Sequence, residues 1–213
     1  IQIQKFGINK EKCFINKPSI DTDFFSRSND KNFHSDPDKI VISTVARLHW
    51  IKDFYFCINF IKTLRDQSIN VFYNIIGDGD ELLKLKFLVK SLELQDYVKF
   101  YGSCNAVGVK NILKVTDIYL MGSFSEGINN SVLEAMAMEI PVVVSNVGGM
   151  GEVVNSDVGI LFQKFKYSKL VNEVINLLKN KNSMINFGKN GRELVLKYHS
   201  IEKSNDKFFK KYN

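Results

Sequence analysis

Two glutamates, Glu126 and Glu134, stand in the segment of this chain with the strongest chemical character. The segment reads SEGINNSVLE over residues 125–134, and it lies between an apolar run typical of a strand and a pattern typical of a helix. Such a loop places Glu126 at the carboxyl end of a strand, while Ser131 and neighbouring amides open the next helix. The unpaired N–H groups and the dipole of a helix N-terminus favour a phosphate. The segment therefore predicts a site for a phosphate-bearing ligand.

A structural interpretation of the same residues stays open. Ser131 and Glu134 have the Ser-x-x-Glu spacing of a capping box, which would satisfy the helix N-terminus internally. That interpretation does not explain Glu126. It also does not explain the pair Gly148-Gly149, which follows the next predicted strand and is either a turn or part of the same edge.

Two further patterns follow predicted strands. Arg47 and Lys52 lie after one strand and would carry positive charge to its carboxyl end, although such a pair is on spacing alone more simply surface charge. Gly77 opens a Gly-x-Gly turn into a helix after another strand. This turn lacks the third glycine of the dinucleotide fingerprint, which disfavours NAD binding.

The elements that position these residues alternate regularly. We expect strands at Ile40–Val45, Val71–Ile76, Val98–Tyr101, Ile118–Met121, Val142–Ser145 and Ile160–Phe162, and helices at Asp53–Arg65, Glu81–Leu92, Val107–Val115, Val132–Met138, Ser168–Leu178 and Ile201–Tyr212. Nearly every strand is apolar on both faces, which predicts a parallel sheet covered on both sides. The fold class is α/β, a doubly wound, Rossmann-like sheet whose ligands bind outside the carboxyl ends of its strands.

Composition and length set the remaining limits. The 213 residues suit one domain, which we place at 26–198, between a connector at 1–25 and a basic, aromatic C-terminal helix at 199–213. The net charge of +6 is spread along the chain, which suits a phosphate-bearing ligand, an anionic membrane surface or an ordinary exterior. The three cysteines are odd in number and lack metal-ligand spacing, so a reducing cytoplasm fits best. Because the chain begins with Ile1, we expect a fragment.

Together these motifs resemble the signature of the family 4 (group 1) retaining glycosyltransferases of the GT-B fold, over a stretch from about Pro18 to the C-terminus. The resemblance implies the C-terminal, nucleotide-sugar-binding half of such an enzyme. It implies that Glu126 contacts the transferred sugar and that Glu134 binds the ribose hydroxyls, since a carboxylate accepts two hydrogen bonds from a diol. In the same way, Arg47 and Lys52 would neutralise the diphosphate leaving group without a metal ion.

The resemblance thus names a set of site residues. The implied catalytic residues are Glu126, Arg47 and Lys52. The implied nucleotide-sugar contacts are Arg47, Lys52, Gly77, Ser103 in the base-binding loop, Glu126, Gly127, Ile128, Asn129, Asn130, Ser131 and Glu134. We expect no metal and no cofactor beyond the sugar-nucleotide substrate. Glu139 departs from the family, which usually has glycine there, and Ile128 bears on donor choice.

The implied activity is transfer of a hexose from a nucleoside-diphosphate sugar, with UDP favoured, in polysaccharide or glycolipid biosynthesis. The acceptor-binding N-terminal half is missing, so we expect the isolated chain to bind nucleotide sugar but to be inactive. We expect a cytoplasmic protein at the inner face of the membrane, with peripheral membrane contact through the full-length enzyme and no nucleic-acid partner. Two alternatives stay open: a non-hydrolysing sugar-nucleotide epimerase, and a catalytically silent nucleotide-sugar-binding module.

Overall fold

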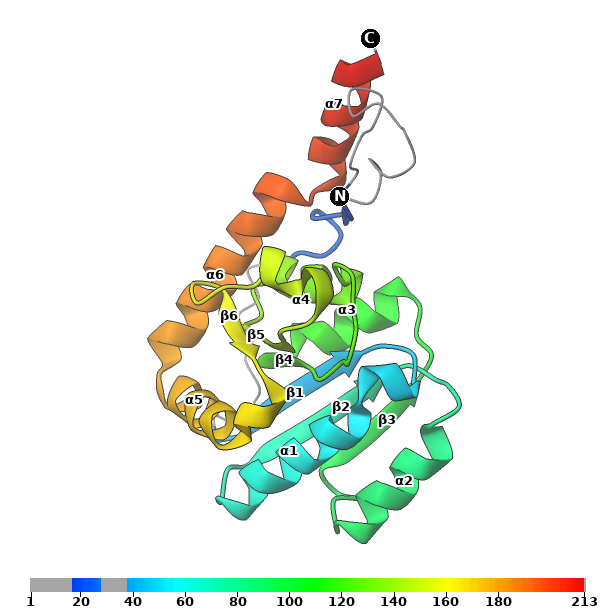
Figure 1. The fold of residues 1–213 in the computed structure, drawn as a ribbon, viewed down its shortest axis with the longest axis vertical. Helices are drawn as coiled ribbons and strands as arrows, with labels where there is room; N and C mark the ends of the chain where they lie inside the picture. Colours follow the sequence, from blue (N-terminus) through cyan, green and yellow to red (C-terminus); the bar gives the residue numbers. More distant parts are fainter. Residues whose placement is uncertain (1–16, 28–37, 213) are drawn as a thin grey trace.

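A computed structural model describes residues 17–27 and 38–212, with side chains up to Asp206. Its centre is a six-stranded parallel sheet in the order β3-β2-β1-β4-β5-β6 (Figure 1). The strands are β1 (Ile40–Val45), β2 (Val71–Ile76), β3 (Val98–Gly102), β4 (Ile118–Met121), β5 (Val142–Ser145) and β6 (Gly159–Phe162). The helices are α1 (Phe54–Asp66), α2 (Leu82–Ser91), α3 (Ala106–Lys114), α4 (Asn130–Ala137), α5 (Tyr167–Lys179), α6 (Lys181–Tyr198) and α7 (Ile201–Tyr212). Short 3-10 turns follow three strands: η3 (Trp50–Lys52), η4 (Gly148–Glu152) and η5 (Lys164–Lys166).

Two hydrophobic cores cover the two faces of the sheet. One contains Ile61 of α1, Leu85 of α2 and Val174 of α5. The other contains Leu113 of α3 and Met136 of α4, together with part of α6. Successive side chains of a strand point to opposite faces of the sheet, and both faces are covered by a core. The strands are therefore apolar on both faces, as the predicted doubly wound fold requires. The α/β, Rossmann-like fold class is confirmed.

The strand order reverses between β1 and β4. From β1 the chain proceeds outward to β2 and β3, and from β4 it proceeds outward to β5 and β6. The loops after β1 and β4 therefore lead to helices on opposite faces, which opens a crevice between them at the carboxyl edge. This topology brings the loop that contains Arg47 and Lys52 next to the loop that contains Glu126.

The predicted strands and helices agree with the structure to within two residues, but the sequence pattern did not predict α6. This helix contains Gly188 and Gly191, which weaken a helical pattern. Both glycines are buried, and a Cβ at Gly188 would lie 2.1 Å from the carbonyl oxygen of Glu139. The glycines thus allow α6 to approach the end of α4. Glu139 itself has φ +57°, the left-handed conformation that glycine adopts most readily.

Part of the expected connector packs against the domain. Ile20 is buried, forms a parallel bridge with Ser200 and donates its N–H to the carbonyl of His199 at 2.9 Å. The side chain of Arg192 donates to the carbonyl of Phe25 at 3.2 Å. Residues 1–16 of the expected connector lie outside the described residues. Helix α7 leads away from the sheet beyond α6 (Figure 1), and the domain boundaries at 25 and 198 stay predictions.

Candidate functional site

A groove of about 530 Å³ lies at the carboxyl edge of the sheet, where the loops after β1, β3 and β4 meet. It is lined by Phe25, Val45, Ala46, Arg47, Lys52, Cys104, Ala106, Val109, Asn129, Asn130, Ser131 and Glu134. The groove therefore brings together the basic pair, the first turn of α4 and Glu134. The residues that line the groove come from four separate parts of the sequence.

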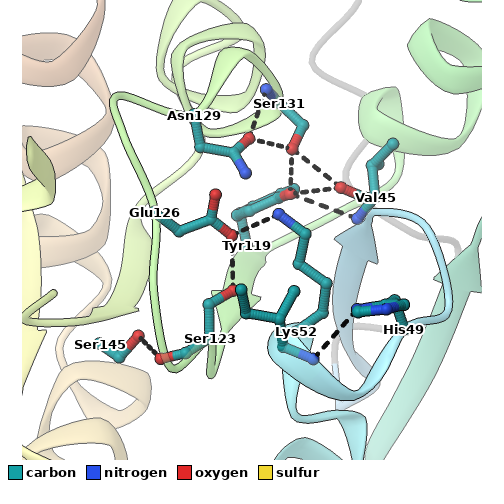
Figure 2. A network of polar contacts seen from close by, with 10 residues as sticks. Val45, His49, Lys52, Tyr119, Ser123, Glu126, Asn129, Ser131 and Ser145 are labelled. Carbon is teal, nitrogen blue, oxygen red and sulfur yellow. Dashed lines mark hydrogen bonds and ion pairs between the residues drawn. The ribbon is translucent and has the colours of Figure 1, made fainter. Parts of the chain in front are cut away.

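Lys52 links this groove to Glu126. Its Nζ lies 2.5 Å from Oε1 of Glu126, and the Ser123 hydroxyl donates to the same oxygen at 2.6 Å (Figure 2). Ser145 in turn donates to the carbonyl of Ser123 at 2.8 Å. The Glu126 side chain is only 8% exposed, and the same carboxylate oxygen accepts from both the Lys52 amine and the Ser123 hydroxyl. Glu126 does not itself line the groove, but its contacts hold it in one orientation beside Lys52, which does.

A second network positions the start of α4. The Ser131 hydroxyl lies 2.7 Å from the Tyr119 hydroxyl and 2.8 Å from the carbonyl oxygen of Val45 (Figure 2). The side chain of Asn129 accepts from the N–H of Ser131 at 2.9 Å and is the N-cap of α4. Since Tyr119 belongs to β4 and Val45 to β1, the network joins both strands at the switch point to the first turn of α4.

The capping-box interpretation is wrong. The N-cap is Asn129 and the helix begins at Asn130, so Ser131 lies inside the first turn and Glu134 in the second. Glu134 instead lines the groove, and burial raises the pKa of its carboxyl to about 7. No described residue forms a hydrogen bond or ion pair with the side chain of Glu134 or of Arg47. Both groups are available to a ligand.

The glycine pair after β5 supports the loop that contains Glu126. Gly148 has φ +53°, and a Cβ there would lie 1.7 Å from the carbonyl oxygen of Glu126. The N–H of Gly149 approaches the same oxygen at 3.4 Å. The pair is therefore more than a turn, because no other residue allows η4 to approach Glu126 so closely.

Several predicted contacts lie beside the groove and do not line it. A Cβ at Gly77 would lie 1.9 Å from the carbonyl oxygen of Ala46, so Gly77 supports the loop after β1. Ser103 is exposed, whereas Cys104 after it lines the groove. Gly127 is exposed, and Ile128 packs partly against the core next to α4.

Other site residues were missed by the sequence interpretation. They are Phe25, Val45, Ala46, Cys104, Ala106 and Val109 in the groove wall, and Tyr119, Ser123 and Ser145 in the supporting networks. Apolar wall residues carry no chemical signal of their own. Ser123 and Ser145 did carry one, because each is a hydroxyl at the carboxyl end of a strand that faces the expected site.

In the part of the chain that the structure describes, no three His, Cys, Asp or Glu side chains are grouped as metal ligands. No helix of the described ranges is both long and apolar enough to cross a bilayer.

Comparisons with known proteins identify sugar-transferring enzymes that are similar to this chain. The sequence model of the family described as "Glycosyl transferases group 1" matches residues 25–194. N-acetyl-alpha-D-glucosaminyl L-malate synthase of Bacillus anthracis is 33% identical over 130 residues, covering 61% of this chain and 34% of that protein. Amylovoran biosynthesis glycosyltransferase AmsK of Erwinia amylovora is 30% identical over 158 residues, covering 71% of this chain and 38% of that protein. The chain thus spans less than half the length of these relatives.

A solved structure shares the fold. Anabaena Alr3699/HepE, crystallised in complex with UDP and glucose, superposes with a TM-score of 0.81 at 18% sequence identity. The match covers 97% of this chain and 58% of that one.

Proposed function

Because this chain belongs to the group 1 glycosyltransferases, we propose that it is the donor-binding half of a retaining enzyme that transfers a sugar from a nucleoside diphosphate. UDP is the favoured nucleotide, a choice supported by the complex of the Anabaena structure with UDP and glucose. The observation that carries the proposal is the groove itself, which gathers Arg47, Lys52, the first turn of α4 and Glu134.

The diphosphate would lie between Arg47, Lys52 and the N-terminus of α4. Arg47 is exposed at the mouth of the groove without an ion-pair partner among the described residues, so a ligand phosphate can take that place. The amides and dipole of the first turn of α4 add positive potential from the other side. As the bond between sugar and diphosphate breaks, negative charge grows on the leaving phosphate and both basic side chains stabilise it. We propose that these groups act without a metal ion.

The nucleoside and the transferred sugar would occupy the two ends of the groove. Glu134 lines the groove together with Ala106 of the wall after β3, and its carboxylate would accept hydrogen bonds from both ribose hydroxyls. The transferred sugar would lie on the side of Lys52, which forms an ion pair with Glu126. Glu126 is fixed by Lys52 and Ser123, so its carboxylate is prepared for hydrogen bonds with hydroxyls of the transferred sugar.

For the whole protein, we also propose an acceptor class and a pathway. AmsK is named for the biosynthesis of the polysaccharide amylovoran, which supports a saccharide acceptor. Since this chain covers 38% of that relative, we propose that a second, N-terminal half completes the acceptor site. We extend the proposal to a cytoplasmic enzyme that contacts the membrane only peripherally, because the excess of basic residues suits anionic lipid.

Calorimetric titration of the chain with UDP tests the donor site. We expect a dissociation constant of roughly micromolar to millimolar, because the contacts are limited to one side of the cleft. Arg47→Ala should weaken binding by at least about tenfold, the loss of one charge-assisted hydrogen bond. Lys86→Ala removes an exposed lysine of α2 outside the groove and should bind UDP as the unchanged chain does.

The absence of binding by UDP, GDP and ADP at millimolar concentration would contradict the proposal. Turnover of a sugar nucleotide by the full-length protein separates a transferase from a silent module, and its product separates a transferase from an epimerase.

A further inference from the structure

Two exposed aromatic rings lie next to each other at the carboxyl edge of the sheet. Trp50 of η3 is 61% exposed, and Phe124 in the loop after β4 is 53% exposed. Their ring centroids are 6.3 Å apart with an angle of 39° between the planes. Neither ring lines the groove. Adjacent large apolar side chains on a surface commonly mark a binding site.

The rings border the Lys52–Glu126 pair. Trp50 belongs to the same short turn as Lys52, and Phe124 precedes Glu126 by two residues. The N–H of Phe124 donates to the carbonyl of Ile51 at 2.8 Å, which joins the two loops. The aromatic pair therefore belongs to the same two joined loops as Lys52 and Glu126, the residues that the proposed function assigns to the transferred sugar.

Both rings are held by neighbouring side chains. Nζ of Lys164 lies 3.4 Å from the centroid of the Phe124 ring, and the same amine forms an ion pair with Asp53 at the start of α1. The His49 ring lies 5.7 Å from that of Trp50. Because these contacts restrict the rings before a ligand arrives, less conformational entropy is lost on binding.

We propose that Trp50 and Phe124 form a stacking surface for a pyranose ring of the acceptor saccharide. This inference rests on the proposed donor site, since the nucleotide sugar fills the groove and the rings lie outside it, beside Glu126. The C–H face of a pyranose packs on an aromatic ring while its hydroxyls remain free at the edge. The ion pair of Lys164 and Asp53 lies beside the Phe124 ring, and charged neighbours of this kind suit a hydroxyl-rich sugar better than an alkyl chain.

The test uses the fluorescence of Trp50, because the chain contains one tryptophan. The chain is titrated with the methyl glycosides of glucose, galactose and N-acetylglucosamine up to about 100 mM, since a single stacked ring binds at roughly millimolar concentration. We expect a saturable blue shift and about twofold less quenching by acrylamide for at least one glycoside, as its ring excludes water from the indole.

Two variants locate the effect. Phe124→Ala should weaken the glycoside response by at least about threefold, because half of the surface is lost. Phe87→Ala is the matched control, since this phenylalanine is 75% exposed on α2, and it should respond as the unchanged chain does. In the full-length enzyme, Trp50→Ala should raise the acceptor KM by at least about tenfold with an unchanged donor KM, and Trp50→Phe should restore most of the loss.

A flat titration with all three glycosides overturns the proposal, as does an identical response of Phe124→Ala and the unchanged chain. An unchanged acceptor KM in Trp50→Ala also overturns it. UDP affinity, measured by calorimetry on the same samples, tests the donor site separately. Glycoside binding without UDP binding would refute the donor function while supporting a saccharide surface at these rings.

Discussion

Replacing Glu134 by Gln should stabilise the chain at alkaline pH. Burial raises the pKa of this carboxyl from 4.5 to about 7, which corresponds to about 3 kcal/mol against the ionised form. Partial solvent exposure of the side chain reduces this to roughly 1–2 kcal/mol. Because the folded pKa lies above the unfolded one, the penalty is absent below about pH 4.5, grows as pH rises and is complete above about pH 7. Urea unfolding should therefore show Glu134→Gln more stable by roughly 1–2 kcal/mol at pH 8 and nearly unchanged at pH 4.5.

The same substitution should weaken nucleotide binding. Ribose hydroxyls donate to the ionised carboxylate, and a group with a pKa of about 7 is about one tenth ionised at pH 6 and nine tenths at pH 8. UDP affinity of the unchanged chain should then rise by about tenfold over this interval. The UDP affinity of Glu134→Gln should not show the increase that ionisation of Glu134 causes between pH 6 and pH 8. At pH 8 this variant should bind UDP roughly 1–2 kcal/mol more weakly than the unchanged chain.

Calorimetry at both pH values measures these affinities. Protonation of UDP itself affects both proteins equally, so its contribution to the pH dependence cancels when the two are compared. A second buffer with a different ionisation enthalpy detects the proton that Glu134 releases on binding near pH 7. Equal UDP affinity of both proteins at pH 8 would refute the ribose role. Equal pH dependence of unfolding would refute the buried, protonated carboxyl.

Two further predictions concern the loop support and the basic pair. Gly148→Ala should lower the free energy of unfolding by at least about 2 kcal/mol, because its Cβ would lie 1.7 Å from the carbonyl oxygen of Glu126. Gly127→Ala is the control, because a Cβ at Gly127 would have no heavy atom within 4 Å. Equal melting temperatures of the two variants would contradict the close approach of Gly148 to Glu126. In the full-length enzyme, Arg47→Ala and Lys52→Ala should each slow turnover by at least about a hundredfold. Normal rates in both would show that the diphosphate is held elsewhere.

Local sequence patterns determined the architecture. The apolar runs, such as Ile40–Val45 and Val142–Ser145, are strands in the structure, because apolarity on both faces suits only a strand covered on both sides. The same patterns placed Arg47 and Glu126 at carboxyl ends of strands, where a doubly wound sheet binds ligands. Helix α6 escaped prediction because its glycines meet another element, a relation that no local pattern records.

The tertiary structure decided how the site residues meet. Lys52 and Glu126 are 74 residues apart, and their ion pair exists because β1 and β4 are neighbours at the switch point. Asn129 rather than Ser131 caps α4, since the Ser131 hydroxyl is engaged with Tyr119 and Val45 from other strands. Local propensity depends on backbone and side-chain preferences within a few residues. Contacts between loops depend on the strand order that the whole core selects, so a local pattern cannot specify them.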